Sequence, residues 1–287
     1  MSDVLGAAII SGSIYALISL GFALGFRVSG VFNLAYGGLL VAAGYANYAF
    51  AVLLGLPTWL SIPISILLIS GIGFAIEGYG VPFAKKVGLT SLDIMVLTWL
   101  LLVVMQDLVI IIFSSTSIYM GSQDVTTGLT FLGTHITSIQ FAIMGLTFAG
   151  ASVLFVISRF TASGREVTAV GDNVALATIC GINVKRVIAL NAVAASLLAA
   201  GAGVLLTYED RLEPTLGMRF SIIAIVATLV GIRLGPGGAV LGAYAFGLLE
   251  SVVLYLVDPG LRDSVVYFCL LAAVTVTYRR KLISDVG

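Results

Sequence analysis

The chain has 287 residues, of which 60% are hydrophobic and only 10% are charged, and its mean hydropathy is +1.14. Soluble domains are about 45 to 50% apolar, so this composition excludes a soluble protein and indicates a polytopic membrane protein in contact with a lipid bilayer. The formal net charge is +0, which excludes the basic surface that a nucleic-acid partner would require.

Apolar runs define the expected membrane spans. A helix needs about 17 to 25 mostly apolar residues to cross the hydrocarbon, and lipid offers its backbone no other hydrogen-bond partners. In chain order the runs are 4–26, 31–54, 59–81, 92–113, 138–160, 187–207, 218–232, 237–257 and 264–278. The seventh run is short, which predicts a tilted, broken or re-entrant helix. We expect one all-α membrane domain over 1–287, with about nine transmembrane or re-entrant helices.

Lysines and arginines indicate the orientation, because cytoplasmic loops near span ends hold an excess of them. They gather after the third run, between the fifth and sixth runs, and in the tail: Lys85, Lys86, Arg159, Arg165, Lys185, Arg186, Arg279, Arg280 and Lys281. The loop 208–217 holds Glu209, Asp210 and Glu213 against the single basic residue Arg211, and is expected outside. Threading nine spans through these loops places the N-terminus outside and the C-terminus in the cytoplasm.

The longest polar stretch covers 161–186 and lies in a predicted cytoplasmic loop. A helical segment of mixed charge has no role inside lipid, but it provides a surface on which a soluble partner can push. This stretch therefore indicates the membrane subunit of a transporter whose energy comes from another protein.

Several motifs are absent. No Gly-x-x-x-x-Gly-Lys-[Ser/Thr] phosphate loop occurs, so this chain does not cradle nucleotide in the usual way. The one histidine, His135, stands in a predicted external loop, which argues against a histidine-based metal or catalytic centre. A membrane enzyme would bring His, Asp or Lys residues together near one interface, and no such pattern occurs. We expect a transport subunit that is not an enzyme and binds no metal or cofactor.

Polar and small residues within the spans are candidates for a substrate path, because polar groups in lipid are costly and interrupted helices expose backbone. The candidates are Asn33, Ala35, Tyr36, Gly37, Gly38, Asp107, Gly237, Gly238 and Glu250. Simpler roles exist for most of them. Such glycines commonly serve close helix packing, and Asp107 or Glu250 could reach towards water at a span end. Interhelical hydrogen bonds are expected for Asn47 and Asn191, and an interfacial anchor for Glu77.

Several stretches together resemble a known family. They are 12–21, 30–37, Glu77 with Pro82, Gly164-Arg165 through Gly181-Ile182-Asn183, 199–205, 231–242 and 247–250. They are similar to the permease subunits of ABC importers for branched-chain amino acids, the LivH/LivM type. Tyr36 stands where that family commonly has histidine. Relatives of the same type move other compounds, including urea and amides.

The resemblance implies a type II ABC importer-like fold in a bacterial or archaeal inner membrane. It implies as partners a second permease subunit, two ATP-binding subunits that hold ATP and Mg²⁺, and an extracytoplasmic solute-binding protein. An ATP-independent secondary carrier is the alternative of a different class.

The resemblance also implies that 161–186 couples the chain to the ATPase, through a short helix over Ala169–Cys180. Val167, Val170, Val174 and Ala177 recur at helical spacing and predict an apolar docking face, with Asp172 and Asn173 towards water. The full set of expected coupling residues is Gly164, Arg165, Glu166, Val167, Ala169, Val170, Asp172, Asn173, Val174, Ala177, Gly181 and Asn183.

Overall fold

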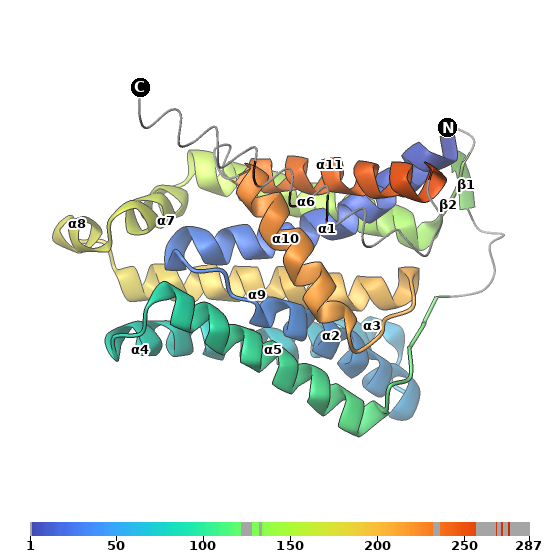
Figure 1. Cartoon of the computed structure of the whole chain (residues 1–287), viewed down its shortest axis with the longest axis horizontal. Helices are drawn as coiled ribbons and strands as arrows, with labels where there is room; N and C mark the ends of the chain where they lie inside the picture. The colour runs from blue at the N-terminus through green and yellow to red at the C-terminus, as the bar shows by residue number, and fades with distance from the viewer. Residues whose placement is uncertain are drawn as a thin grey trace.

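A computed structural model describes residues 2–121, 128–131, 134–231 and 236–256, together with residues 268, 271 and 275. The ninth expected span and the basic tail lie outside the described residues, apart from those three positions. The described part is a bundle of long helices that run mainly along one axis (Figure 1).

The bundle contains helices of very different length. Their bounds are α1 Ser2–Ser29, α2 Ala35–Tyr48, α3 Thr58–Phe74, α4 Val81–Lys86, α5 Ser91–Phe113, α6 Ser138–Phe160, α7 Ala162–Asp172, α8 Val174–Ile179, α9 Val184–Glu209, α10 Leu216–Gly231 and α11 Pro236–Leu256. Two π-helical turns, η1 Ala49–Leu53 and η2 Ala75–Gly80, continue α2 and α3. The strands β1 Gly128–Phe131 and β2 Thr134–Thr137 form an antiparallel hairpin, which the all-α expectation did not include.

Local chemistry sets several of the helix ends. Gly30 follows α1 with φ of 67°, a left-handed conformation that glycine adopts without a Cβ penalty and that commonly ends helices. Thr90 begins α5 with a capping box, in which its hydroxyl accepts from the Asp93 N–H and the Asp93 carboxylate accepts from the Thr90 N–H. Such reciprocal bonds satisfy two donors that a helix start leaves unpaired.

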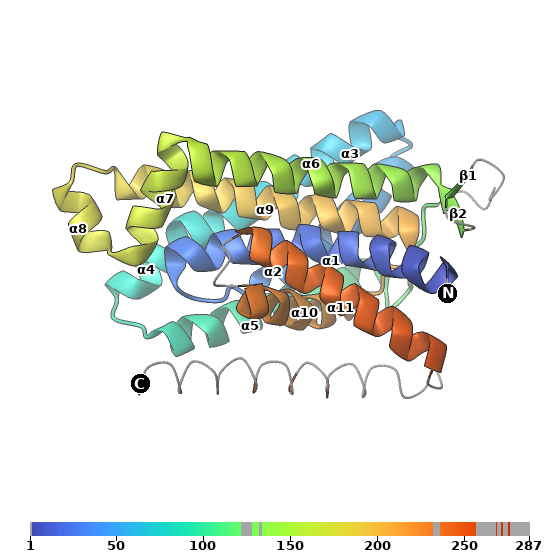
Figure 2. The ribbon, with the colours of Figure 1, turned by 90° about the horizontal axis from the view of Figure 1, so that it is seen from above.

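The two ends of the bundle differ in charge. Helices α4, α7 and α8 lie at one end, while the hairpin and the start of α1 lie at the other (Figures 1 and 2). Lys85 and Arg165 belong to the first end, whereas Glu209 and Asp210 close α9 at the second. Following the predicted orientation, we call these the inner end and the outer end.

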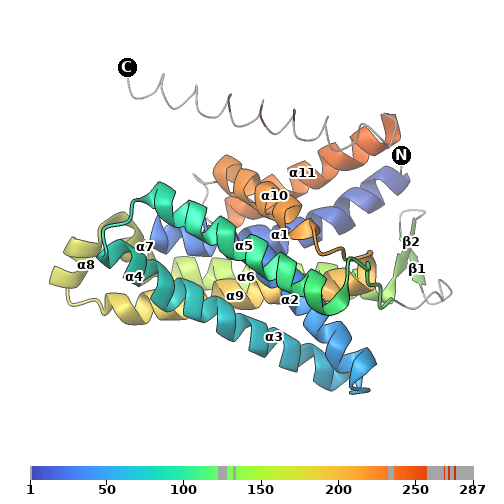
Figure 3. The same ribbon diagram turned by 60° about the horizontal axis from the view of Figure 1, so that its bottom comes forward.

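Helix α9 lies at the centre of the packing. Figure 2 shows α6, α9 and α1 side by side, and Figure 3 places α3 and the α10–α11 pair on opposite sides of the bundle. Alanines 195, 199, 200 and 202 of α9 are almost fully buried. A Cβ on Gly203 would overlap with the Leu40 carbonyl of α2, so the small residues bring these backbones into close contact.

Both interhelical hydrogen bonds expected for asparagines are confirmed. The Asn191 Nδ2 of α9 donates to the Leu24 carbonyl of α1 at 2.8 Å. The Asn47 Oδ1 of α2 accepts from Ser61 at 3.0 Å, and its Nδ2 donates to the Tyr208 hydroxyl at 3.2 Å. These bonds join helices that are distant in the sequence.

The expected set of nine transmembrane or re-entrant helices is confirmed in part. Within the described residues, six helices are long and apolar enough to cross a membrane: Gly6–Ser29, Ala35–Leu53, Thr58–Lys86, Ser91–Phe113, Ile143–Phe160 and Val184–Glu209. Leu216–Gly231 and Gly237–Val253 are shorter apolar helices. At about 1.5 Å rise per residue, the 16 residues of α10 fall short of a hydrocarbon core about 30 Å thick, as the short seventh run predicts.

Candidate functional site

The polar stretch forms two short helices that pack against the inner end of the bundle. Thr161 caps α7 by accepting from the Gly164 N–H at 3.2 Å, and Gly164 is buried where a Cβ would overlap with the Ile157 carbonyl. Arg27, near the end of α1, donates to the Thr168 hydroxyl at 3.1 Å. The position of α7 is thus fixed by both α6 and α1.

The expected single helix over Ala169–Cys180 is wrong. Asn173 has φ of −157° and ψ of 105°, which is extended backbone, and it separates α7 from α8. Its side chain accepts from the Leu176 N–H at 3.0 Å and so caps α8. Asparagine at such a position satisfies a donor that a continuous helix would not leave open.

The expected docking face is also wrong in part. Val170 and Ala177 are 1% and 3% exposed, and they form a cluster with Val28 of α1 and Val187 of α9. Val167 and Ala169 pack against the same cluster. The apolar side chains that recur along α7 and α8 therefore pack against α1 and α9 of the same chain. Short amphipathic helices gain most of their stability from burying an apolar face in this way.

A different apolar surface faces outwards on α8. Val174, Leu176 and Ile179 are 50%, 59% and 80% exposed. Asp172 and Asn173 are exposed beside them, as expected. We call Val174, Leu176 and Ile179 the α8 apolar face.

The other residues that were expected to couple to an ATPase have varied environments. Arg165, Gly181 and Asn183 are exposed, and Glu166 is half-buried. Gly181 has φ of 82° and follows α8, while the Asn183 side chain caps α9 by accepting from the Arg186 N–H at 3.1 Å. Gly181 and Asn183 therefore shape the return of the chain into the bundle.

Asn33 lies in a buried hydrogen-bond network at the break between α1 and α2. Asn33 and Glu77 are each 3% exposed, and the Asn33 Nδ2 donates to a Glu77 carboxylate oxygen at 2.5 Å. Asn33 Oδ1 accepts from the Ala35 N–H at 3.0 Å, and Thr98 Oγ1 accepts from the Leu34 N–H at 3.2 Å. Side chains thus satisfy the backbone at the break between α1 and α2.

Glu77 is therefore not an interfacial anchor. It is buried in η2, and Lys85, from the next helix, donates to the Ser29 carbonyl at the end of α1. The π-helical turn changes which face of the α3–α4 rod carries Glu77, and such turns commonly occur at functional sites. Sequence reasoning missed this because Asn33, which donates to the Glu77 carboxylate, lies 44 positions away in the sequence.

The small residues of the expected path mostly serve helix packing. Ala35 and Tyr36 are fully buried. A Cβ on Gly37 would overlap with Gly217 and Ser221 of α10, one on Gly38 would lie 2.9 Å from the Met105 sulfur, and one on Gly238 would overlap with the Gly231 backbone. Gly237 has no atom within 4 Å of the place where a Cβ would stand.

Glu250 is the central residue of a buried polar cluster towards the outer end. It is 1% exposed, accepts from the Tyr15 hydroxyl of α1 at 2.6 Å, and forms an ion pair with Arg219 of α10 at 2.7 Å. Three helices, α1, α10 and α11, therefore meet through one carboxylate. Because Glu250 lies within the protein, it does not simply reach towards water from the end of α11.

Arg219 and Tyr15 were missed by sequence reasoning. Arg219 is the second residue of the seventh apolar run, and a charged residue within such a run is by itself a signal of a functional site. Tyr15 gives no comparable signal, because tyrosine is common at both surfaces of a membrane. Asp107, by contrast, is exposed on α5.

The family model described as branched-chain amino acid transport system / permease component matches residues 4–274. The chain belongs to this family. It is a multi-pass permease of the inner membrane, and it is a transport subunit without catalytic activity of its own. The membership confirms the resemblance that the sequence motifs carried.

Two relatives are named for different substrates. The chain is 28% identical over 284 residues to the high-affinity branched-chain amino acid transport system permease protein LivH of Escherichia coli, covering 92% of this chain and 89% of LivH. It is 27% identical over 252 residues to the ribose import permease protein RbsC of Haemophilus influenzae, covering 84% and 74%. The chain is thus about equally similar to a permease named for branched-chain amino acids and to one named for ribose.

A solved structure shares the fold. A chain of PsaBC from Streptococcus pneumoniae, in complex with Fab, superposes with a TM-score of 0.51 and 14% identity, covering 95% of this permease and 90% of that chain. The helical architecture described above therefore occurs in at least one solved structure.

Proposed function

We propose that this permease is one of two membrane subunits of an ATP-driven importer for a branched-chain or other hydrophobic amino acid, which an extracytoplasmic binding protein delivers. The main support for an ATP-driven mechanism is the exposure of the α8 apolar face. Its three side chains are at least half exposed at the inner end, and an amphipathic helix that leaves apolar residues uncovered is a common way to dock in a groove of a partner.

The coupling segment has a direct mechanical connection to the outer end. Val170 and Ala177 pack on Val28 of α1 and Val187 of α9. From there α1 runs through Tyr15 in its middle to the outer end, and α9 ends at Glu209. Closure of two ATPases would push α7 and α8, and rigid helices would transmit that push to the residues that line the outer side. This is rigid-body rocking of the kind that alternating access requires.

The second permease subunit is proposed to cover α5. This span is the most apolar of the six, and only 17% of its most apolar window is buried. Leu100, Val104, Leu108 and Ile111 are exposed along it, and Asp107 is exposed among them. A carboxylate directed at lipid is costly, so a water-filled path shared with the second subunit is the environment that fits Asp107.

Reconstitution tests the proposal. The complex should purify with two ATP-binding subunits, and proteoliposomes that contain it should accumulate radiolabelled L-leucine only when ATP and the binding protein are both supplied. Uptake of L-leucine without ATP would contradict the proposal in favour of a secondary carrier. ATP-driven uptake of urea or ribose in place of L-leucine would retain the machinery and contradict the substrate.

A further inference from the structure

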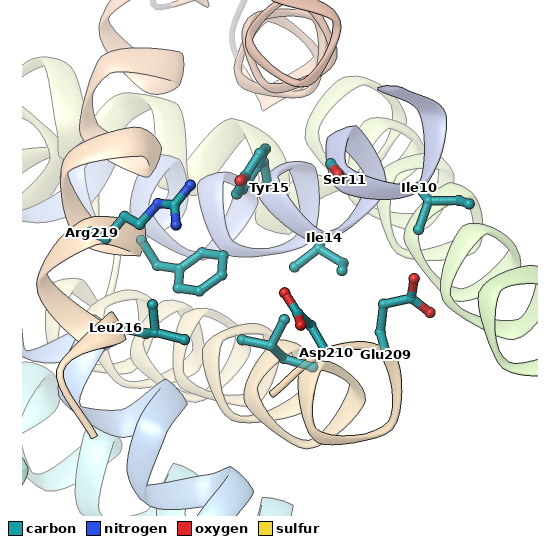
Figure 4. Close-up of a pocket in the computed structure, with 10 residues that line it drawn as sticks. Ile10, Ser11, Ile14, Tyr15, Glu209, Asp210, Leu216 and Arg219 are labelled. Atoms are coloured by element: carbon teal, nitrogen blue, oxygen red, sulfur yellow. The ribbon is translucent and has the colours of Figure 1, made fainter. Parts of the chain in front are cut away.

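A cavity of about 140 Å³ lies near the outer end, between α1, α9 and α10. Five apolar side chains line it, namely Ile10, Ile14, Leu206, Leu216 and Phe220. The polar lining consists of Ser11, Tyr15, Glu209, Asp210 and Arg219, all of which Figure 4 labels. A cavity of about 150 Å³ lined by Leu, Ile and Phe can hold benzene, so this one has room for a small solute.

Charges of both signs face this cavity from different helices. Figure 4 shows the Arg219 guanidinium on one side and the carboxylates of Asp210 and Glu209 on another. Arg219 comes from the first turn of α10, and the two acids end α9. The lining is therefore a dipolar one, with an apolar surface beside it.

The charged groups are held in place by other residues. Glu250 pairs with Arg219 at 2.7 Å and accepts from Tyr15 at 2.6 Å, while Gln140 of α6 donates to Glu209 at 2.8 Å. A guanidinium carries five N–H donors, so its ion pair with Glu250 is compatible with a second carboxylate on the same group. Side chains positioned in this way bind charged ligands with little reorganisation.

These features match one chemical class. A zwitterionic amino acid presents a carboxylate and an ammonium on one carbon, and an aliphatic side chain on the other side. A sugar has no charged group to offer Arg219, Glu209 or Asp210, so it would bind without the charge-assisted hydrogen bonds that a zwitterion can form. A simple anion would match Arg219 but would approach Glu209 and Asp210 unfavourably.

We propose that this outer cavity binds an aliphatic amino acid as a zwitterion, with its carboxylate on Arg219, its ammonium at Glu209 and Asp210, and its side chain among Ile14, Leu216 and Phe220. The inference rests on the proposed function and adds to it a substrate-binding site within one permease subunit. A solute released by the binding protein would then bind this selective site before it enters the path between the two permease subunits.

Ligand binding to the purified full complex, without the binding protein, tests this site. L-Leucine should raise its thermal unfolding temperature, whereas 4-methylpentanoate and 3-methylbutylamine, which each lack one of the two charges, should not. The double variant Glu209→Gln/Asp210→Asn should bind L-leucine about ten-fold more weakly, because charge-assisted hydrogen bonds are lost. Glu213→Gln makes the same type of change at an exposed acid of the same loop, and should bind as the wild type does.

The outcomes separate this inference from the proposed function. Unchanged L-leucine affinity in the double variant, or binding of either analogue as tightly as L-leucine, would overturn the cavity assignment. ATP-driven L-leucine uptake by a wild-type complex that shows no leucine-dependent shift would overturn the site and leave the proposed function intact. A shift that requires both charges, without any ATP-driven uptake, would support the site and contradict the proposed function.

Discussion

Asn33 shows how a single polar residue in a span can be recognised from sequence while its role is not. Its cost in lipid marks it as special, and the structure places it against Glu77 at 2.5 Å with both side chains buried. In this structure it helps to satisfy the backbone at the break between α1 and α2. The pairing depends on the three-dimensional arrangement of α2 and η2, which no local sequence pattern encodes.

The Asn33–Glu77 bond can be tested by exchanging its two groups. Asn33→Asp places a second carboxylate beside Glu77, and we expect a loss of about 3–5 kcal/mol in stability, as for other uncompensated buried charges. Adding Glu77→Gln restores one donor and one acceptor across the same contact. The thermal unfolding temperature of the purified complex should fall strongly in Asn33→Asp, and most of that loss should be recovered in the double variant. Equal decreases in both would mean that the bond itself contributes little.

The sequence predicts that a helix is present more readily than it predicts which helices pack against each other. Apolar length is enough to place α1, α3, α5, α6 and α9, because lipid requires every span to satisfy its own backbone. Which face packs against which neighbour depends on small residues on both partners. Val170 and Ala177 illustrate this, since their spacing predicts an apolar face equally well whether the face meets an ATPase or α1 of the same chain.

The two glycines of α9 provide a matched test of close helix packing. A Cβ on Gly203 would overlap with the Leu40 carbonyl, whereas one on Gly201 has no atom within 4 Å. Gly203→Ala should therefore lower stability by about 1–3 kcal/mol through overpacking. Gly201→Ala should be neutral or stabilising by up to about 1 kcal/mol, because alanine favours helix. Unfolding temperatures of the two purified variants give the comparison, and a smaller loss at 203 than at 201 would contradict the packing of α2 on α9.

The two faces of the coupling segment should respond differently to the same substitution. Ile179→Glu and Val174→Glu change exposed residues of the α8 apolar face, and should abolish stimulated ATP hydrolysis while the permease still inserts and folds. Val170→Glu buries a charge among Val28, Ala177 and Val187, and should lower the amount of folded permease. Ile179→Leu keeps the apolar contact and should retain stimulation. Normal ATP-driven transport by Ile179→Glu would show that α8 is not the docking surface.

For the whole molecule, orientation depends on which side of the membrane receives α7 and α8, and a natural thiol reports it. Cys180 is free and exposed directly after α8. In a Cys269→Ser background, a membrane-impermeant maleimide should leave Cys180 unlabelled in intact cells and label it in inverted vesicles. The α8 apolar face then stands where ATP-binding subunits can reach it, and the outer cavity opens towards the binding protein. Labelling from outside would reverse the bundle, and with it the direction of transport that the charge distribution predicts.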